Sequence, residues 1–226
     1  KAALFIVDAM EGTLLTSLEV EGVDGVANGL STPKLADYNA DGVADYAYAG
    51  DLQGNLWRFD LLRNARSDTA PFTTEDDSEN AIDDFEVAFG GQPLFSAIAN
   101  IGTQVRQPIT SAPSLVLHPT RFGYMVIFGT GKFFETGDKD GDKSFAQTVY
   151  GIWDKQTLGE EASDPNIARS SLQEQTITTQ TTVEANGTTR QGLVLSNNNV
   201  SWQGSDTQAA QNGWFLNLRQ SQGEMV

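Results

Sequence analysis

Short apolar runs and small polar turns alternate along the chain, with the two-residue period of β-strands. The run 3–8 predicts a buried strand, and Glu11-Gly12 predicts a turn with a returning strand. A hairpin that carries aromatic residues is predicted over 46–60, with its turn at 50–55. Further strands are predicted at 93–97, 104–108, 114–117, 122–128, 147–154, 192–195 and 213–218. No long amphipathic helix competes with them, so the predicted fold class is mainly β.

A weak internal repeat indicates which kind of mainly β fold this chain has. Segments 4–14, 46–60, 149–154 and 214–218 each place short strands around a small-residue or acidic turn, and several end in Asp. Repeated strand–turn–strand units with aromatic residues are typical of a β-propeller with antiparallel blades. We therefore expect residues 1–226 to be a single β-propeller domain, modified or incomplete, or part of one.

Two large loop insertions are expected to interrupt the blades. The first, at about 63–91, is acidic and loses the strand period, with a short helix expected at Glu86. The second, at about 155–191, is polar and rich in Gln, Thr and Glu, which predicts exposed hairpins or a flexible loop. The chain opens on Lys1 inside a strand pattern, without a signal peptide, which indicates a piece of a longer polypeptide.

The stretch 37–45 has the spacing of a calcium loop. Oxygen-bearing side chains occupy its first, third, fifth and ninth positions, with Gly42 at the sixth. Hard cations bind six to eight oxygen ligands, and Gly42 can adopt the backbone angles that a tight coil needs. The predicted Ca²⁺ ligands are Asp37, Asn39, Asp41, the backbone carbonyl of Val43, and Asp45. The alternative is a polar turn that binds nothing.

This loop differs from a helical EF-hand at its twelfth position, where Tyr48 replaces the expected bidentate glutamate. The residues that follow Asp45 alternate like a strand, so the loop is predicted to lead into a β-strand. A second acidic turn, Asp138 to Asp142, has its glycine at the fourth position, which favours a weak cation site or none.

Composition limits the classes of partner. The chain has 226 residues and a net charge of -16, a surface that repels the phosphate backbone of nucleic acid and favours divalent cations. It contains no cysteine, which excludes disulfides, a thiol nucleophile and a cysteine zinc site. No run of eighteen apolar residues is present, so no membrane-spanning helix is predicted.

The run 37–60 resembles the C-terminal β-propeller of PilY-type proteins, which are type IV pilus biogenesis factors and tip-associated adhesins. The stretches 128–133, 148–154, 213–216 and 223–224 resemble later parts of the same domain. The resemblance implies calcium bound at Asp37–Asp45, and a role in the balance between pilus extension and retraction and in surface adhesion. It implies pilins, minor pilins or host surface ligands as partners. It also implies export through the periplasm and outer membrane to the cell surface or fimbrium.

Two other classes of function stay open. Propellers also host quinoprotein enzymes, but His118 is the only histidine and no nucleophile motif is present, so we expect no enzymatic activity. Integrin-like adhesins of other systems use similar calcium loops, usually in several blades, whereas only one good copy occurs here. Some members of the PilY-type family carry an Arg-Gly-Asp tripeptide that binds integrins; this sequence has none, so integrin binding is not expected. The four tryptophans favour packing between blades over a sugar-binding face.

Overall fold

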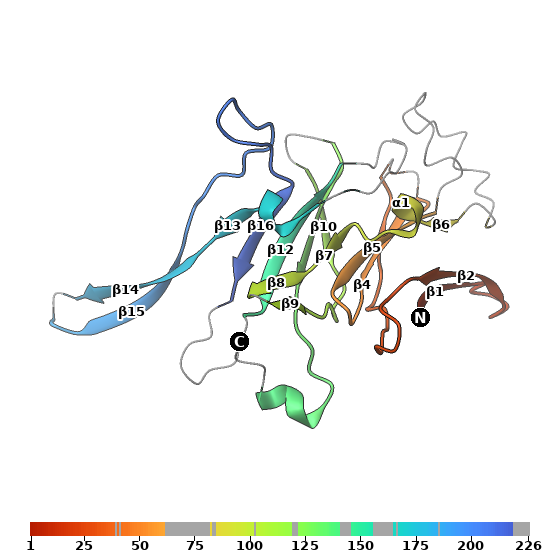
Figure 1. The fold of residues 1–226 in the computed structure, drawn as a ribbon, viewed down its shortest axis with the longest axis horizontal. Coiled ribbons are helices and arrows are strands. Elements are labelled where there is room, and N and C mark those ends of the chain that lie inside the picture. The colour runs from red at the N-terminus through yellow and green to blue at the C-terminus, as the bar shows by residue number, and fades with distance from the viewer. Residues whose placement is uncertain are drawn as a thin grey trace.

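The computed structural model describes residues 1–38, 40, 42–61, 82, 85–101, 103–118, 122–140, 146–155, 165, 167–184 and 186–218. Strands dominate these residues, and the helical segments are short (Figure 1). Within the described ranges no helix has the length and apolar character that crossing a bilayer requires. The mainly β prediction is confirmed.

The first sheet is an antiparallel pair, β1 (Ala2–Val7) and β2 (Leu14–Val20). Asp8 holds the turn between them, because its Oδ1 accepts hydrogen bonds from the backbone N–H groups of Met10 and Glu11 at 2.7 and 2.8 Å. Side chains of a strand alternate between its two faces, and one face of this pair buries Ala2, Leu18 and Val20. The predicted strand, turn and returning strand are therefore present.

The second sheet has the strand order β3-β4-β5-β6, and β7 also pairs with β5. Its strands are β3 (Lys34–Ala36), β4 (Tyr46–Gly50), β5 (Asn55–Asp60), β6 (Glu86–Val87) and β7 (Phe95–Ser96). Every residue of β4 and β5 is buried, because both faces of the sheet are covered. Tyr46 and Tyr48 face one side of the sheet, and Ala47 and Ala49 face the other.

The β4–β5 turn is organised by the buried carboxylate of Asp51. Its Oδ1 accepts the backbone N–H groups of Gln53 and Asn55 at 2.9 and 2.8 Å, and its Oδ2 accepts the indole N–H of Trp57 at 2.9 Å. Gly54 has a φ of 82°, a region that glycine enters without steric cost. The aspartate and glycine that predicted this hairpin turn are thus the residues that close it.

The third sheet has the order β10-β11-β12-β16-β13. Its strands are β10 (Ser114–Leu117), β11 (Tyr124–Gly129), β12 (Thr148–Asp154), β13 (Gln173–Gln175) and β16 (Gly213–Asn217). All its pairs are antiparallel except β13 with β16, which is parallel. The predicted strands at 114–117, 122–128, 147–154 and 213–218 all lie in this sheet.

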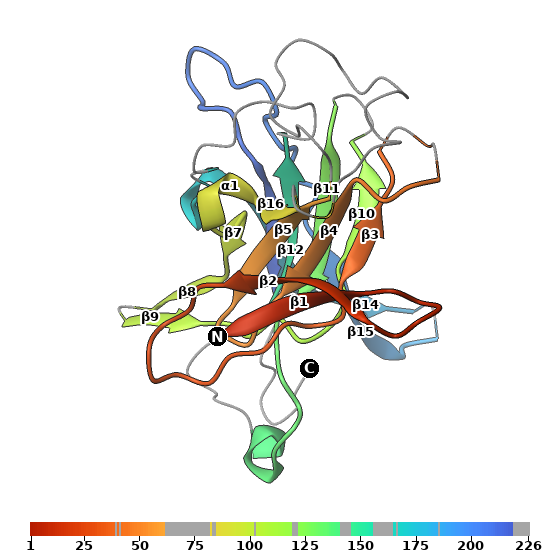
Figure 2. The same cartoon turned by 90° about the vertical axis from the view of Figure 1, so that its right-hand side faces the viewer.

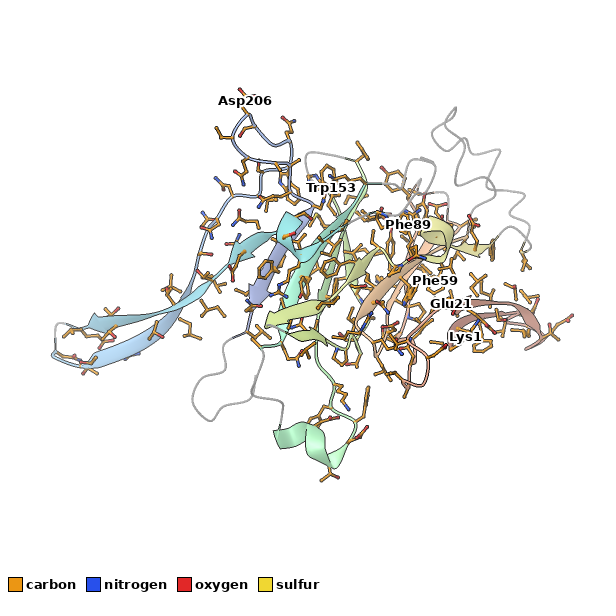
Figure 3. All side chains as sticks on the ribbon, in the orientation of Figure 1. Lys1, Glu21, Phe59, Phe89, Trp153 and Asp206 are labelled. Atoms are coloured by element: carbon orange, nitrogen blue, oxygen red, sulfur yellow. The ribbon has the colours of Figure 1, made fainter. Side chains whose placement is uncertain are left out.

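The three sheets stack face to face in chain order (Figures 1 and 2). One apolar cluster joins the second sheet to the third, through Tyr46, Tyr48 and Leu56 on one side and Val126 and Tyr150 on the other. A second cluster joins the first sheet to the opposite face of the second. It includes Leu18, Val20, Trp57 and Phe59, the last labelled in Figure 3. Because both faces of the second sheet are covered, β5 also buries polar and charged side chains, among them Arg58 and Asp60.

Two hairpins and three helical turns complete the described chain. The hairpins are β8 (Ile98–Ile101) with β9 (Thr103–Arg106), and β14 (Ile177–Val183) with β15 (Thr189–Leu195). The β14–β15 hairpin extends away from the stacked sheets (Figure 1). The helical turns are α1 (Ala88–Gly91), η3 (Thr136–Asp140) and η4 (Arg169–Ser171).

One local prediction needs correction. Glu86 does not begin a helix: it lies in β6 and pairs with Asp60, and the short helical turn α1 follows it. The predicted strand at 192–195 is present: it belongs to β15 and pairs with β14 in the projecting hairpin. Most of the predicted insertion at 63–91 lies outside the described residues.

Candidate functional site: a loop between two blades

The candidate cation loop connects β3 to β4 in the second sheet. The loop is closed by hydrogen bonds in which backbone N–H groups donate to side-chain carboxylates. Gly42 N–H donates to Asp37 Oδ2 at 2.9 Å, and Tyr38 N–H donates to Asp45 Oδ2. Ala40 and Gly42 have φ values of 64° and 96°, so the chain coils tightly within the loop. A residue other than glycine adopts such an angle only at a cost, which marks this as a constrained loop.

Asp45 ties the loop to the core of the sheet. Its side chain is fully buried, its backbone N–H donates to Ala36 O at 2.8 Å, and its carbonyl accepts Leu61 N–H at 2.9 Å. Asp37, by contrast, is exposed at the mouth of the loop. The loop therefore brings together two carboxylates, one fixed in the interior and one accessible from solvent.

The loop also contacts the third sheet. Tyr124 at the start of β11 donates its hydroxyl hydrogen to the carbonyl oxygen of Asp37 at 3.2 Å. Gly123 N–H donates to the hydroxyl of Tyr38 at 3.2 Å, and the two tyrosine rings meet edge to face at 5.5 Å. Burial, with the negative charges of Asp45 and Asp37, raises the pKa of Tyr124 to about 12. This contact between two sheets was not predicted from the sequence.

The predicted ligands fall into two groups. Asp37, Val43 and Asp45 lie in the described loop, and the side chain of Val43 is exposed. Asn39 and Asp41 lie outside the described residues. Within the described part of the chain, no group of three or more acidic, histidine or cysteine side chains is arranged to hold a metal ion. The oxygen donors of Asp37 and Asp45 fit a hard cation by type.

In the second acidic turn, the first carboxylate is bonded to backbone N–H groups and paired with a lysine. Asp138 Oδ2 accepts the backbone N–H groups of Phe134 and Glu135 at 2.8 and 2.9 Å, and Asp138 Oδ1 lies 3.2 Å from Lys132 Nζ. These hydrogen bonds and the ion pair lower the pKa of Asp138. Asp142, the other end of the predicted motif, lies outside the described residues.

A buried ionic network lies near the loop, between the same two sheets. Arg58 of β5 pairs with Asp60 at 2.7 Å and with Asp154 of β12 at 3.0 Å, and Tyr48 OH donates to Asp154 Oδ2 at 2.8 Å. The guanidinium also lies over the ring of Phe89, with its carbon 4.3 Å from the ring centroid. Phe89 is labelled in Figure 3. Asp60 and Asp154 are the terminal aspartates that marked the sequence repeat, and the fold brings both to one arginine.

These features define the class of protein: a propeller-type stack of antiparallel blades with an acidic loop at the contact between two blades. Within this class, the chain belongs to the PilY1 family, because a family model described as the PilY1 beta-propeller domain matches residues 1–190. The resemblance seen in the sequence and the propeller prediction are both confirmed. The described sheets do not close into a ring.

Known proteins support this assignment. Type IV pilus biogenesis factor PilY1 of Pseudomonas aeruginosa strain PAO1 is 51% identical over 230 residues, covering 100% of this chain and 20% of that protein. A PilY1 homolog of Xylella fastidiosa strain Temecula1 is 32% identical over 163 residues, covering 68% of this chain and 10% of that protein. The chain thus spans at most 20% of the length of these two relatives.

The fold also matches a solved structure. The crystal structure of the Pseudomonas aeruginosa PilY1 C-terminal domain aligns with a TM-score of 0.82 and 51% sequence identity, over 96% of this chain and 44% of that chain. The relatives are named as pilus biogenesis factors and not as enzymes.

Proposed function

We propose that this domain is a calcium-binding module of a type IV pilus biogenesis protein. The observation that carries the proposal is the closed loop in which Gly42 and Tyr38 turn the carboxylates of Asp37 and Asp45 toward the loop backbone. The ion's ligands would be Asp37, Asn39, Asp41, the carbonyl oxygen of Val43, and Asp45. Bound Ca²⁺ would supply charge neutralisation and cross-linking of the loop, and no chemical step.

Repulsion between carboxylates is the energetic reason for this loop to bind a cation. Carboxylates gathered in one short loop repel one another, and an ion that binds only the folded loop stabilises the folded state by mass action. The expected stabilisation is about 2.7 kcal/mol at roughly a hundredfold excess of calcium over its Kd. Because Asp45 is buried beside β4, the ion would act on the sheet itself and not on a detached surface loop.

The biological role follows from the family. In the whole protein we infer that calcium occupancy influences pilus assembly, including the balance of extension and retraction, and surface adhesion. The expected partners are pilins or minor pilins, or ligands on a host surface, met at the cell surface or fimbrium after export through the periplasm and outer membrane. Membership of a family whose relatives are named for type IV pilus biogenesis supports this inference.

Thermal unfolding in calcium and in chelator tests the proposal. The wild-type midpoint is expected to rise by about 5–10 °C in saturating calcium, and the rise is expected to disappear in Asp45→Asn, which keeps the side-chain volume. Asp8→Asn is the matched control, because Asp8 also accepts two backbone N–H groups in a turn but lies at the β1–β2 hairpin, outside the loop. Equal midpoints for the wild type in both solutions would disprove the proposal.

A further inference from the structure

The loop and the third sheet share more than a single contact. The carbonyl of Asp37 accepts the Tyr124 hydroxyl, and the Tyr38 hydroxyl accepts the backbone N–H of Gly123, both at 3.2 Å. Asp37 is the first predicted ligand and Tyr38 follows it directly. The position of this end of the loop is therefore set by residues of a different blade.

The same β10–β11 connection contributes His118 and Phe122 to an aromatic cluster. Trp153 and Trp202 complete this cluster. The backbone N–H of His118 donates to the carbonyl oxygen of Gly123 at 2.9 Å, and the indole N–H of Trp153 donates to the carbonyl oxygen of Phe122 at 2.8 Å. The ring of His118 stacks on Trp153 with centroids 4.5 Å apart and meets Trp202 edge to face at 4.6 Å. Trp153 is labelled in Figure 3, on β12. A continuous set of contacts thus joins the loop to two tryptophans.

We propose that Tyr38 and Tyr124 are positioning residues of the cation loop, and that they couple calcium binding to the docking of the second sheet on the third. This rests on the proposed calcium function and extends it from a local site to a contact between blades. The aromatic cluster is the part of the third sheet that responds. The wild-type loop is held ready for the ion by the neighbouring blade.

Thermodynamic linkage relates the calcium affinity of the loop to the strength of the contact between the two blades. If the blade contact favours calcium binding by some factor, calcium favours the blade contact by the same factor. A hydrogen bond between neutral groups contributes a net stabilisation that corresponds to about a threefold to tenfold change in an equilibrium constant. Removal of the Tyr124 hydroxyl should therefore weaken calcium binding, although this residue donates no ligand to the ion.

Calcium titrations of purified protein, followed by calorimetry and by tryptophan emission, test this. Tyr124→Phe is expected to raise the calcium Kd about threefold to tenfold and to reduce the calcium-dependent change in emission. Tyr38→Phe removes the acceptor of Gly123 N–H and is expected to act in the same direction. Tyr150→Phe is the control in the same sheet: the Tyr150 hydroxyl donates to Gln107 at 2.7 Å and accepts from Arg169, outside the loop, so the calcium Kd of this variant is expected to equal that of the wild type.

The outcomes separate this inference from the function on which it rests. Wild-type binding with an unchanged Kd in both Tyr38→Phe and Tyr124→Phe would overturn the coupling and leave the calcium function intact. An equal loss of affinity in Tyr150→Phe would overturn it too, because the effect would then follow general stability. Absence of calcium binding by the wild type would overturn both. Trp202→Phe, expected to bind calcium normally with a smaller emission change, assigns the signal to the cluster.

Discussion

Arg58 and Asp154, 96 residues apart in the sequence, form a buried two-point contact in which the Nη1 group of the arginine donates to both carboxylate oxygens at 3.0 and 3.2 Å. Arg58 belongs to the second sheet and Asp154 to the third, and the side chain of each is 1% exposed. Burial raises the pKa of the neighbouring Asp60, and Arg58 opposes that rise. The network therefore depends on one cation shared by two carboxylates from adjacent blades.

Asp154→Asn is expected to lower the free energy of unfolding by about 3 kcal/mol, near the low end for breaking a buried ion pair. The cost stays at that end because Arg58 keeps Asp60 as a partner at 2.7 Å. Chemical denaturation of the wild type and the variant measures the difference in the free energy of unfolding, provided that this free energy falls with denaturant concentration at the same slope in both proteins.

The control for this prediction is an exposed ion pair. Glu19→Gln removes the contact with Lys1 at 3.5 Å, where both side chains are more than half exposed, and a change below about 1 kcal/mol is expected. If Asp154→Asn cost no more than Glu19→Gln, the two sheets would not depend on the buried network.

Gly151→Ala is expected to destabilise the third sheet by about 1–3 kcal/mol through overpacking. A Cβ atom at Gly151 would lie 2.5 Å from the indole of Trp214 on the neighbouring strand β16. Gly129→Ala, on the other neighbouring strand, meets no atom within 4 Å and should change stability little. Denaturation midpoints measure both variants, and equal values would contradict this packing.

Alkaline pH should unfold the protein through its buried tyrosines. Burial raises the pKa of Tyr46, Tyr48 and Tyr150 above the ordinary value, and raises that of Tyr124 to about 12. Below pH about 10 the phenols are neutral in both states; above it the unfolded chain loses protons that the folded chain keeps, so stability falls as pH rises.

Absorbance of tyrosinate, recorded beside near-ultraviolet circular dichroism, checks this behaviour. We expect the tyrosinate signal of these four residues to appear together with the loss of tertiary structure, at a pH well above the ordinary phenol pKa. Ionisation of all four near pH 10 in a protein with native dichroism would show that their rings are accessible to solvent.

Local structure was readable in the sequence wherever a strand and its turn are adjacent. The hairpin over 46–60 could be predicted because Asp51 and Gly54 close a short turn between two alternating runs. The strand at 114–117 was predicted with the bounds that β10 has.

Contacts between sheets could not be predicted in the same way. The Asp60 and Asp154 pattern was visible as a repeat, and Asp60 lies two residues from Arg58 on β5, but only the stacking of the blades brings Asp154 to Arg58. Tyr124 has no local signal that connects it with Asp37, 87 residues earlier. Glu86 was wrongly expected in a helix because its pairing with Asp60 crosses a long connection.

The most direct test of the central claim is a crystal structure of this protein grown in calcium. We expect one ion in the loop, with oxygen atoms of Asp37, Asp45 and Val43 at about 2.3–2.6 Å, and Tyr124 still bonded to the Asp37 carbonyl. Calcium absent from the loop at saturating concentration, or bound only at another turn such as the one at Asp138, would contradict the account.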